Sequence, residues 1–156
     1  MGKWLDYMSK VLFYLRGVHM PVVRAADAVV HELHGAVFSS YAAPARGSRE
    51  LCAWRLEVPG RTTGAAHTVS KEEVLLVLSG TLSVTLSGGD GDGGAAGEPS
   101  DSPAQASAGD AIVVPAGAVL RIDNHGDQRA SAWVTTSVGL EARLADGSSI
   151  SPPWVR

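Results

Sequence analysis

The chain has 156 residues, 45% of them apolar, and a formal net charge of −3. This length fits one domain with enough apolar side chains for a core, and the weak negative charge argues against nucleic acid as a partner. The one cysteine, Cys52, excludes an internal disulfide, and no apolar run reaches the roughly 18 residues of a membrane span. We therefore expect a cytoplasmic protein that binds neither nucleic acid nor membrane.

Residues 1–19 differ in composition from the rest of the chain. They hold two of the three lysines and two of the three methionines, and their apolar residues recur at helical spacing. Because Met20 resembles a second start, we interpret residues 1–19 as an extension that comes from a vector or an upstream start. The alternative is an amphipathic helix that docks on a partner or a membrane surface. The single domain is then expected to comprise residues 20–156.

From residue 22 onward the pattern is typical of short β-strands. Residues 51–58 alternate, with Cys52 and Trp54 on one face and Arg55 on the other. Further strands are expected at residues 81–86, 111–114, 119–123 and 132–138. Glycine and proline mark the breaks between them, and no helix is predicted inside this region. Many short strands of this kind indicate an antiparallel sandwich or barrel.

The segment Val74–Leu78 is apolar at every position and so breaks the alternation. A strand in a lone small barrel should show one polar face to water. We therefore expect both faces of this strand to be covered, one by the core and the other by a second sheet or subunit. This argues for a homodimer, although an N-terminal strand of the same chain would cover the face equally well.

Residues 87–108 consist mainly of Gly, Ala, Ser, Asp and Pro, without aromatic or β-branched residues. Such a segment buries too little apolar surface to offset the entropy lost on ordering, so a flexible loop is predicted. Its acidic residues lack the ordered spacing of a calcium loop, which favours a solvated linker.

Two segments contain residues at the spacing of a known pair of motifs. The first runs from His67 through Glu73 to Gly80, and the second from Gly109 through Pro115-Ala-Gly117 to Asn124. In both, the chain resembles the cupin superfamily, and the resemblance covers roughly residues 36–138. It implies an all-β fold, a cupin-like antiparallel β-barrel that is also described as a double-stranded β-helix or jelly roll.

The resemblance also implies a ligand set for a divalent metal ion, formed in typical cupins by three histidines and one glutamate. Here His67 and Glu73 stand at two of these positions, but Val69 and Leu120 occupy the other two. Three protein ligands are the common minimum for a catalytic metal. We therefore predict no firmly held cofactor. The alternative is a divalent metal on His67 and Glu73 with a substitute ligand such as Cys52.

Strand parity places residues 67, 69, 73, 75 and 77 on the inward face. The predicted ligand-binding residues are mainly apolar: Cys52, Trp54, Val69, Leu75, Leu120 and Ile122. Beside them, His67 and Glu73 are the candidate catalytic residues, because an apolar pocket can move the pKa values of both towards neutrality, as general acid–base catalysis requires. The alternative is a structural His67–Glu73 hydrogen bond that satisfies two buried polar groups.

The function predicted first is that of a degenerate cupin, which binds a small, largely apolar molecule without a firmly held metal. Two alternatives remain open. One is a metal-dependent oxygenase or isomerase that uses His67 and Glu73 with a substitute ligand. The other is a structural or regulatory homodimer with a closed core.

Overall fold

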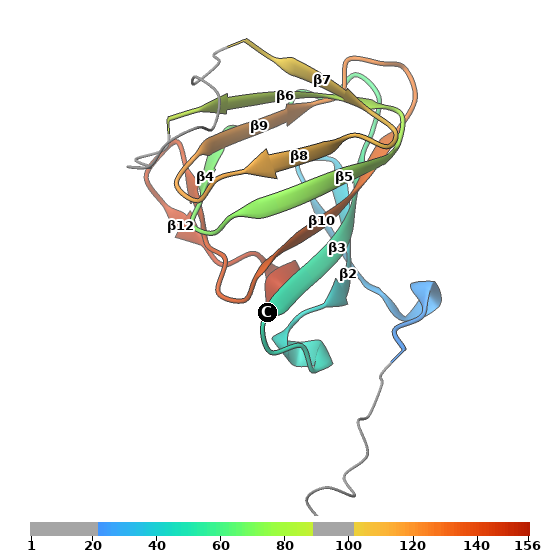
Figure 1. The fold of residues 1–156 in the computed structure, drawn as a ribbon, viewed down its shortest axis with the longest axis vertical. Helices are drawn as coiled ribbons and strands as arrows, with labels where there is room; N and C mark the ends of the chain where they lie inside the picture. The colour runs from blue at the N-terminus through green and yellow to red at the C-terminus, as the bar shows by residue number, and fades with distance from the viewer. Residues whose placement is uncertain (1–21, 89–101) are drawn as a thin grey trace, which may run out of the picture.

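A computed structural model of the chain describes residues 22–88 and 102–156, so residues 1–19 lie outside its description. The described residues form two antiparallel sheets that pack face to face (Figure 1). In order, the first sheet contains β1 (Val29–Leu33), β2 (Ala36–Ala42), β3 (Leu51–Val58), β10 (Ala130–Ser137), β5 (Glu73–Ser79) and β8 (Ala111–Val114). The second contains β12 (Ser149–Ile150), β11 (Ala142–Leu144), β4 (His67–Val69), β9 (Val119–Asp123), β6 (Thr81–Ser87) and β7 (Ala104–Ser107).

The all-β fold expected from the strand pattern and the jelly roll implied by the resemblance are confirmed, although the two sheets do not join into one closed barrel. Three short 3-10 helices complete the described part: η1 (Ala25–Asp27), η2 (Pro44–Arg46) and η3 (Pro153–Val155). None of the helices in the described part is long and apolar enough to cross a membrane.

The core lies between the sheets and follows the alternation of the strands. On β5 every second residue, Glu73, Leu75 and Val77, is buried, while the residues between them are exposed. On the opposite sheet Leu82 and Leu120 are fully buried against this layer. Inward side chains of both sheets thus form one continuous core, as the period of two requires.

Gly80 joins β5 to β6 and is required at this position for two reasons. Its φ of 73° lies in the left-handed region, and a Cβ placed there would meet the Cβ of Ala130 at 2.8 Å. The break marked by this glycine is therefore a tight turn between β5 and β6.

The segment predicted as a loop contains a strand. Residues 104–107 form β7, which pairs with residues 81–84 of β6, while residues 89–101 lie outside the described part. Its small residues satisfy the ladder with backbone groups alone, and Ala106 is buried against the core. Composition did not indicate this strand, because the hydrogen bonds of a β-ladder come from the backbone and do not require large side chains.

The outer face of β5 is not covered by any strand of the described part. Val74, Leu76 and Leu78 are between 39% and 45% exposed. The N-terminal strand β1 pairs with β2 at the opposite edge of the same sheet, so it does not cover this face.

Candidate functional site

A cavity of about 320 Å³ lies between the two sheets. Its walls come mainly from apolar side chains of both sheets, including Trp54, Leu75 and Val134 of the first and Val69 and Leu120 of the second. The described side chains that line it include three ionisable groups, His34, His67 and Glu73, and neither lysine nor arginine. The cavity is therefore a largely apolar space with few polar groups.

His67 begins β4, where its Cα partners are Leu120 on β9 and Leu144 on β11. Its Nδ1 lies 3.1 Å from the carbonyl oxygen of Ala65. Because a carbonyl oxygen only accepts, Nδ1 carries the proton of this hydrogen bond. In the neutral ring Nε2 then keeps its lone pair and is available as a base or a hydrogen-bond acceptor.

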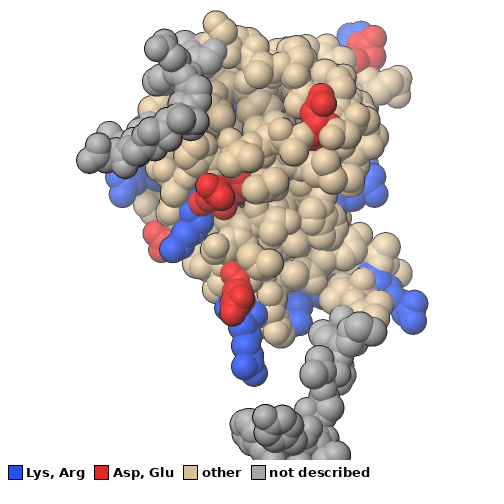
Figure 2. All heavy atoms as spheres, viewed as in Figure 1, with Lys and Arg blue, Asp and Glu red and all other residues tan. Residues whose placement is uncertain are grey.

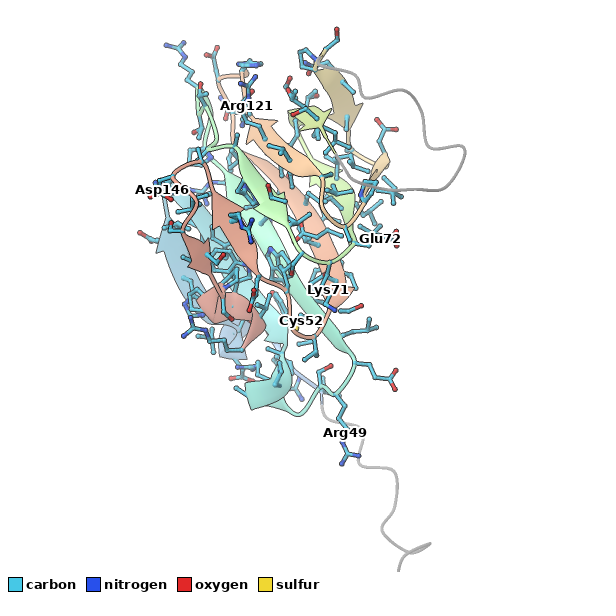
Figure 3. All side chains as sticks on the ribbon, turned by 90° about the vertical axis from the view of Figure 1, so that its left-hand side faces the viewer. Arg49, Cys52, Lys71, Glu72, Arg121 and Asp146 are labelled. Carbon is cyan, nitrogen blue, oxygen red and sulfur yellow. The ribbon has the colours of Figure 1, made fainter. Side chains whose placement is uncertain are left out.

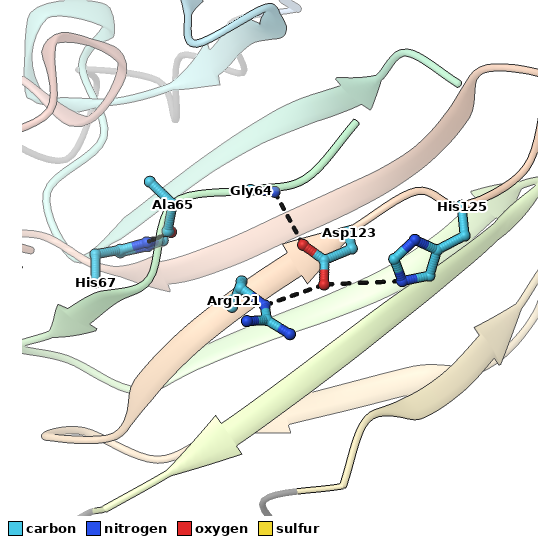
Figure 4. A network of polar contacts seen from close by, with 6 residues as sticks. All are labelled: Gly64, Ala65, His67, Arg121, Asp123 and His125. Carbon is cyan, nitrogen blue, oxygen red and sulfur yellow. Dashed lines mark hydrogen bonds and ion pairs between the residues drawn. The ribbon is translucent and has the colours of Figure 1, made fainter. Parts of the chain in front are cut away.

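The loop that carries Ala65 is held against β9 by a buried carboxylate (Figure 4). Asp123 Oδ1 accepts a hydrogen bond from the backbone N–H of Gly64 at 2.9 Å, and Oδ2 accepts one from Arg121 Nε at 3.0 Å. His125 Nε2 lies 3.9 Å from the same oxygen. A Cβ at residue 64 would meet a backbone oxygen of β9 at 2.2 Å, so only glycine allows this close approach.

Glu73 begins β5 and is only 5% exposed. Its side chain lines the cavity and forms no hydrogen bond or ion pair within residues 22–88 and 102–156. The predicted His67–Glu73 hydrogen bond is therefore not formed. Burial raises the pKa of Glu73 to about 7, since the apolar surroundings disfavour the carboxylate. Near neutral pH the cavity thus contains a carboxyl group that exchanges its proton readily.

The positions that lack histidine are filled by apolar side chains. Val69 and Leu120 are each 1% exposed and line the cavity beside His67 and Glu73. Within the described residues no group of three His, Cys, Asp or Glu side chains is placed to hold a metal ion. The donor set therefore does not fit a resident divalent metal, because two protein ligands fall short of the usual three.

The remaining predicted lining residues separate into two groups. Trp54, Leu75 and Ile122 line the cavity as the parity argument placed them. Cys52 is fully buried but does not line it: Sγ lies 3.4 Å from the carbonyl oxygen of Val155, and burial raises the pKa of the thiol. The thiol packs beneath the C-terminal residues, so Cys52 is poorly placed to act as a substitute ligand. Glu72, the carboxylate that precedes Glu73, is exposed at the edge of the molecule and does not line the cavity (Figure 3).

Two parts of the cavity wall were not predicted. His34 lines the cavity from the β1–β2 turn, where it has a φ of 50° and is followed by Gly35. Trp154 of η3 forms another part, with its ring stacked on Phe38 at 3.8 Å and its carbonyl oxygen bonded to Ser40 Oγ at 2.8 Å. For His34, the sequence offers only the His-Gly pair of the turn as a signal. For Trp154, the contact joins the C-terminal residues to β2, and no local pattern in the sequence indicates it.

Comparison with known families identifies the scaffold. The family described as Cupin domain matches residues 54–137, more than half of the chain. This chain is a cupin. The match spans both motif segments and most of the cavity-lining strands, and it confirms the resemblance seen in the spacing.

Cupins of known structure share the fold at low sequence identity. The polyketide cyclase RemF of Streptomyces resistomycificus aligns with a TM-score of 0.65 at 14% identity, over 81% of this chain and 86% of that one. A sugar phosphate isomerase of Silicibacter pomeroyi aligns at 0.58 and 12%, over 83% and 92%. A predicted oxalate decarboxylase of Thermotoga maritima aligns at 0.59 and 13%, over 75% and 98%. No curated protein matches the sequence. These similarities establish the fold of this cupin and leave its ligand to the cavity itself.

Proposed function

We propose that this cupin binds one small, neutral, largely apolar molecule between its sheets, without a resident metal ion. The observation that carries the proposal is the cavity of about 320 Å³, whose walls are mostly apolar. That volume lies at the lower end of the roughly 300–1,000 Å³ found for ligand pockets. It suits a single compact molecule.

The charge of the lining argues for a neutral ligand. A phosphate or carboxylate buried in an apolar cavity needs a cationic partner. No lysine or arginine lies among the described lining residues, and ionised Glu73 would repel an anion. The substrate classes named for the sugar phosphate isomerase and the oxalate decarboxylase are therefore disfavoured here.

The aromatic side chains argue for a flat ligand. Trp54, Phe38 and Trp154 all line the cavity, and the ring of Trp154 stacks on Phe38 and lies 6.4 Å from that of Trp54. Aromatic walls favour ring systems through offset or edge-to-face contacts. A neutral aromatic or polycyclic molecule, with an oxygen that hydrogen-bonds to Glu73 or His67, combines these features.

The binding test uses two naphthalene probes that differ in charge. N-phenyl-1-naphthylamine is neutral, and 1-anilinonaphthalene-8-sulfonate is its anionic counterpart. We expect the neutral probe to bind one per chain with enhanced fluorescence, and the anion to bind at least about tenfold more weakly, a difference of about 1.4 kcal/mol.

A cavity-filling variant assigns the binding to this cavity. Ile122→Trp places a larger ring in the cavity, and Val30→Trp, on the exposed strand β1, is the matched control. The neutral probe should be lost from the first variant and kept by the second, with circular dichroism confirming that both are folded. Unchanged binding to Ile122→Trp, or no binding to the wild type, would overturn the proposal.

A second candidate function is proton transfer on the bound molecule. It is favoured by the hydrogen bond that leaves His67 Nε2 as a base, and by the pKa of about 7 that leaves Glu73 able to donate a proton. With an enolisable ketone, Nε2 would remove the proton next to the carbonyl group and Glu73 would protonate the carbonyl oxygen, giving the enol. The reverse transfers return the ketone.

Deuterium exchange tests this candidate. α-Tetralone, a neutral aryl ketone, is incubated with the protein in D₂O, and incorporation next to the carbonyl group is followed by nuclear magnetic resonance. We expect the wild type to accelerate exchange, and His67→Ala to abolish the acceleration while still binding the neutral probe. If the wild type gives only the buffer rate, proton transfer on such ketones is overturned and binding alone remains.

A further inference from the structure

Most acidic side chains in the described part of the protein reach solvent, as the red groups on the face in Figure 2 do. Within residues 22–88 and 102–156 two of them are buried, Glu73 in the cavity and Asp123 on β9. Asp123 is 1% exposed and follows Ile122, which lines the cavity. Because successive side chains of a strand point to opposite faces, Asp123 lies on the side of β9 away from the cavity. A buried charge at this place therefore acts through the groups that it contacts.

The two oxygens of this carboxylate have different partners (Figure 4). Oδ2 lies 3.0 Å from Arg121 Nε and 3.9 Å from His125 Nε2, and both of these side chains reach solvent. Oδ1 accepts a hydrogen bond of 2.9 Å from the backbone N–H of Gly64. A hydrogen bond to an ionised acceptor is roughly twice as strong as a neutral one. One oxygen of Asp123 thus binds the backbone of the segment that precedes β4.

The segment between Thr62 and His67 is fixed at its two ends. Thr62 and Asn124 exchange backbone hydrogen bonds of 2.9 and 2.8 Å, and His67 begins β4. The residues between them belong to no strand. Gly64 is one of these residues, so its hydrogen bond to Asp123 fixes the middle of a segment whose ends are already held.

The residue after Gly64 carries the carbonyl group that orients the ring of His67. Ala65 O lies 3.1 Å from His67 Nδ1 and, as a carbonyl oxygen, can only accept. The hydrogen bond at one ring nitrogen decides which nitrogen of a neutral imidazole carries the proton. If the Ala65 carbonyl group turned away, Nδ1 would lose its acceptor, and Nε2 would carry the proton in part of the molecules.

We propose that Asp123 is a positioning residue for His67. By holding the N–H of Gly64, its carboxylate directs the Ala65 carbonyl group at Nδ1, which keeps the proton there and leaves Nε2 as the base. The inference rests on the second candidate function, in which Nε2 removes a proton from the bound ketone. The tautomer itself is a property of the protein without ligand, so it is measured independently of that reaction.

The first experiment determines the tautomer of His67 by nuclear magnetic resonance. Long-range ¹H–¹⁵N correlation spectra of the full ¹⁵N-labelled chain distinguish Nδ1–H from Nε2–H, and His67→Ala identifies the signals of this ring. In mildly alkaline buffer, where an ordinary histidine is neutral, wild-type His67 should be Nδ1–H. In Asp123→Ala the ratio of Nδ1–H to Nε2–H should fall at least about fivefold, because the carbonyl acceptor is no longer held in place.

Two further variants separate this role from a general loss of structure. Asp123→Asn keeps a side-chain oxygen for the Gly64 N–H and should restore the wild-type tautomer, since the half-exposed Arg121 can turn to solvent. Asp127→Ala removes a carboxylate that forms an exposed ion pair with Arg61 next to the same segment. It is the matched control and should leave the tautomer unchanged. Thermal unfolding verifies that each variant is folded.

A second route displaces the same segment without removing the carboxylate. In Gly64→Ala the added Cβ would meet the carbonyl oxygen of Ile122 at 2.2 Å, so the backbone must move away from β9. This variant should shift the tautomer of His67 in the same direction as Asp123→Ala. It also decides the question if Asp123→Ala does not fold.

Deuterium exchange connects the tautomer to the reaction. Asp123→Ala should lower the acceleration of exchange into α-tetralone about tenfold or more while still binding the neutral naphthylamine, and Asp123→Asn should restore it. Two results would overturn the proposal: a wild-type His67 with its proton on Nε2, and a folded Asp123→Ala or Gly64→Ala variant that keeps Nδ1–H. A wild type that gives only the buffer rate overturns proton transfer instead, and the spectra still decide the role of Asp123.

Discussion

At the residue scale, the side chain with the largest effect is that of Glu73, whose ionised form is disfavoured by burial. Glu73 is buried among apolar neighbours and lacks a hydrogen bond in the described part of the chain. The folded protein therefore holds its proton up to a pH of about 7, whereas the unfolded chain releases it near the ordinary value of 4.5. The group links stability to pH in a direction opposite to that of a salt-bridged carboxylate.

The sign of this linkage gives a prediction for Glu73→Gln. Between pH 4.5 and about 7 the folded state holds the proton that the unfolded state has lost, so the free energy of unfolding falls as pH rises. The total loss is on the order of 3 kcal/mol, from the shift and about 1.4 kcal/mol per pH unit. Urea unfolding across this range should show the fall for the wild type and a flatter profile for Glu73→Gln, which has no proton to lose. Equal slopes for the two proteins would contradict the assignment.

The two motif positions that hold Val69 and Leu120 in place of histidine give a second prediction at this scale. Residues 67 and 120 are direct Cα partners on β4 and β9, and residue 69 lines the same cavity. The double variant Val69→His/Leu120→His should therefore bind Co²⁺ and show its visible absorption bands, because it brings the donors to four. The wild type and Val30→His should show none. A folded double variant without Co²⁺ bands would mean that the two positions do not converge with His67 and Glu73.

At the element scale, the short helix η3 closes the cavity although it belongs to neither sheet. Trp154 stacks on Phe38 of β2, while Ser40 Oγ bonds to the Trp154 carbonyl oxygen and Cys52 Sγ approaches that of Val155. The indole nitrogen of Trp154 has no partner within the described residues, so packing rather than hydrogen bonding holds this ring.

Truncation of this ring should therefore be costly. Trp154→Ala is expected to lower the free energy of unfolding by about 3–5 kcal/mol, as for other buried aromatic residues. Ser40→Ala, which removes only the hydrogen bond to the same segment, should cost about 1 kcal/mol. Urea unfolding measures both. A loss below 1 kcal/mol for Trp154→Ala would show that η3 does not seal the core.

At the scale of the whole molecule, the first sheet presents two different faces. On β5, Leu75 lines the cavity, whereas its neighbour Leu76 is exposed on the outer side of the sheet. A substitution on the outer side should therefore leave ligand binding unchanged. We expect Leu76→Glu to bind the neutral naphthylamine within about twofold of the wild type, a difference under about 0.5 kcal/mol. Loss of binding in this variant, measured by fluorescence titration, would show that the cavity depends on the outer side of the sheet.

The sequence by itself determined the class of the scaffold. Alternation in residues 51–58, the glycine between β5 and β6 and the spacing from His67 to Asn124 are local features, and each corresponds to a strand, a turn or a motif of the fold. The two apolar residues at ligand positions were also visible, because they fall at fixed intervals within single strands.

Only the tertiary structure decided which side chains share the cavity. His34 lines it from a hairpin turn, and Trp154 lines it from the C-terminal residues. Cys52 lies outside it and contacts Val155, although strand alternation places Cys52 on the same face as Trp54. Likewise, residues 104–107 became a strand because β6 offered an edge to pair with. The physical reason is common to all of these cases. Parity fixes the face of a strand toward which a side chain points, whereas the occupant of the space beyond it depends on contacts between distant segments.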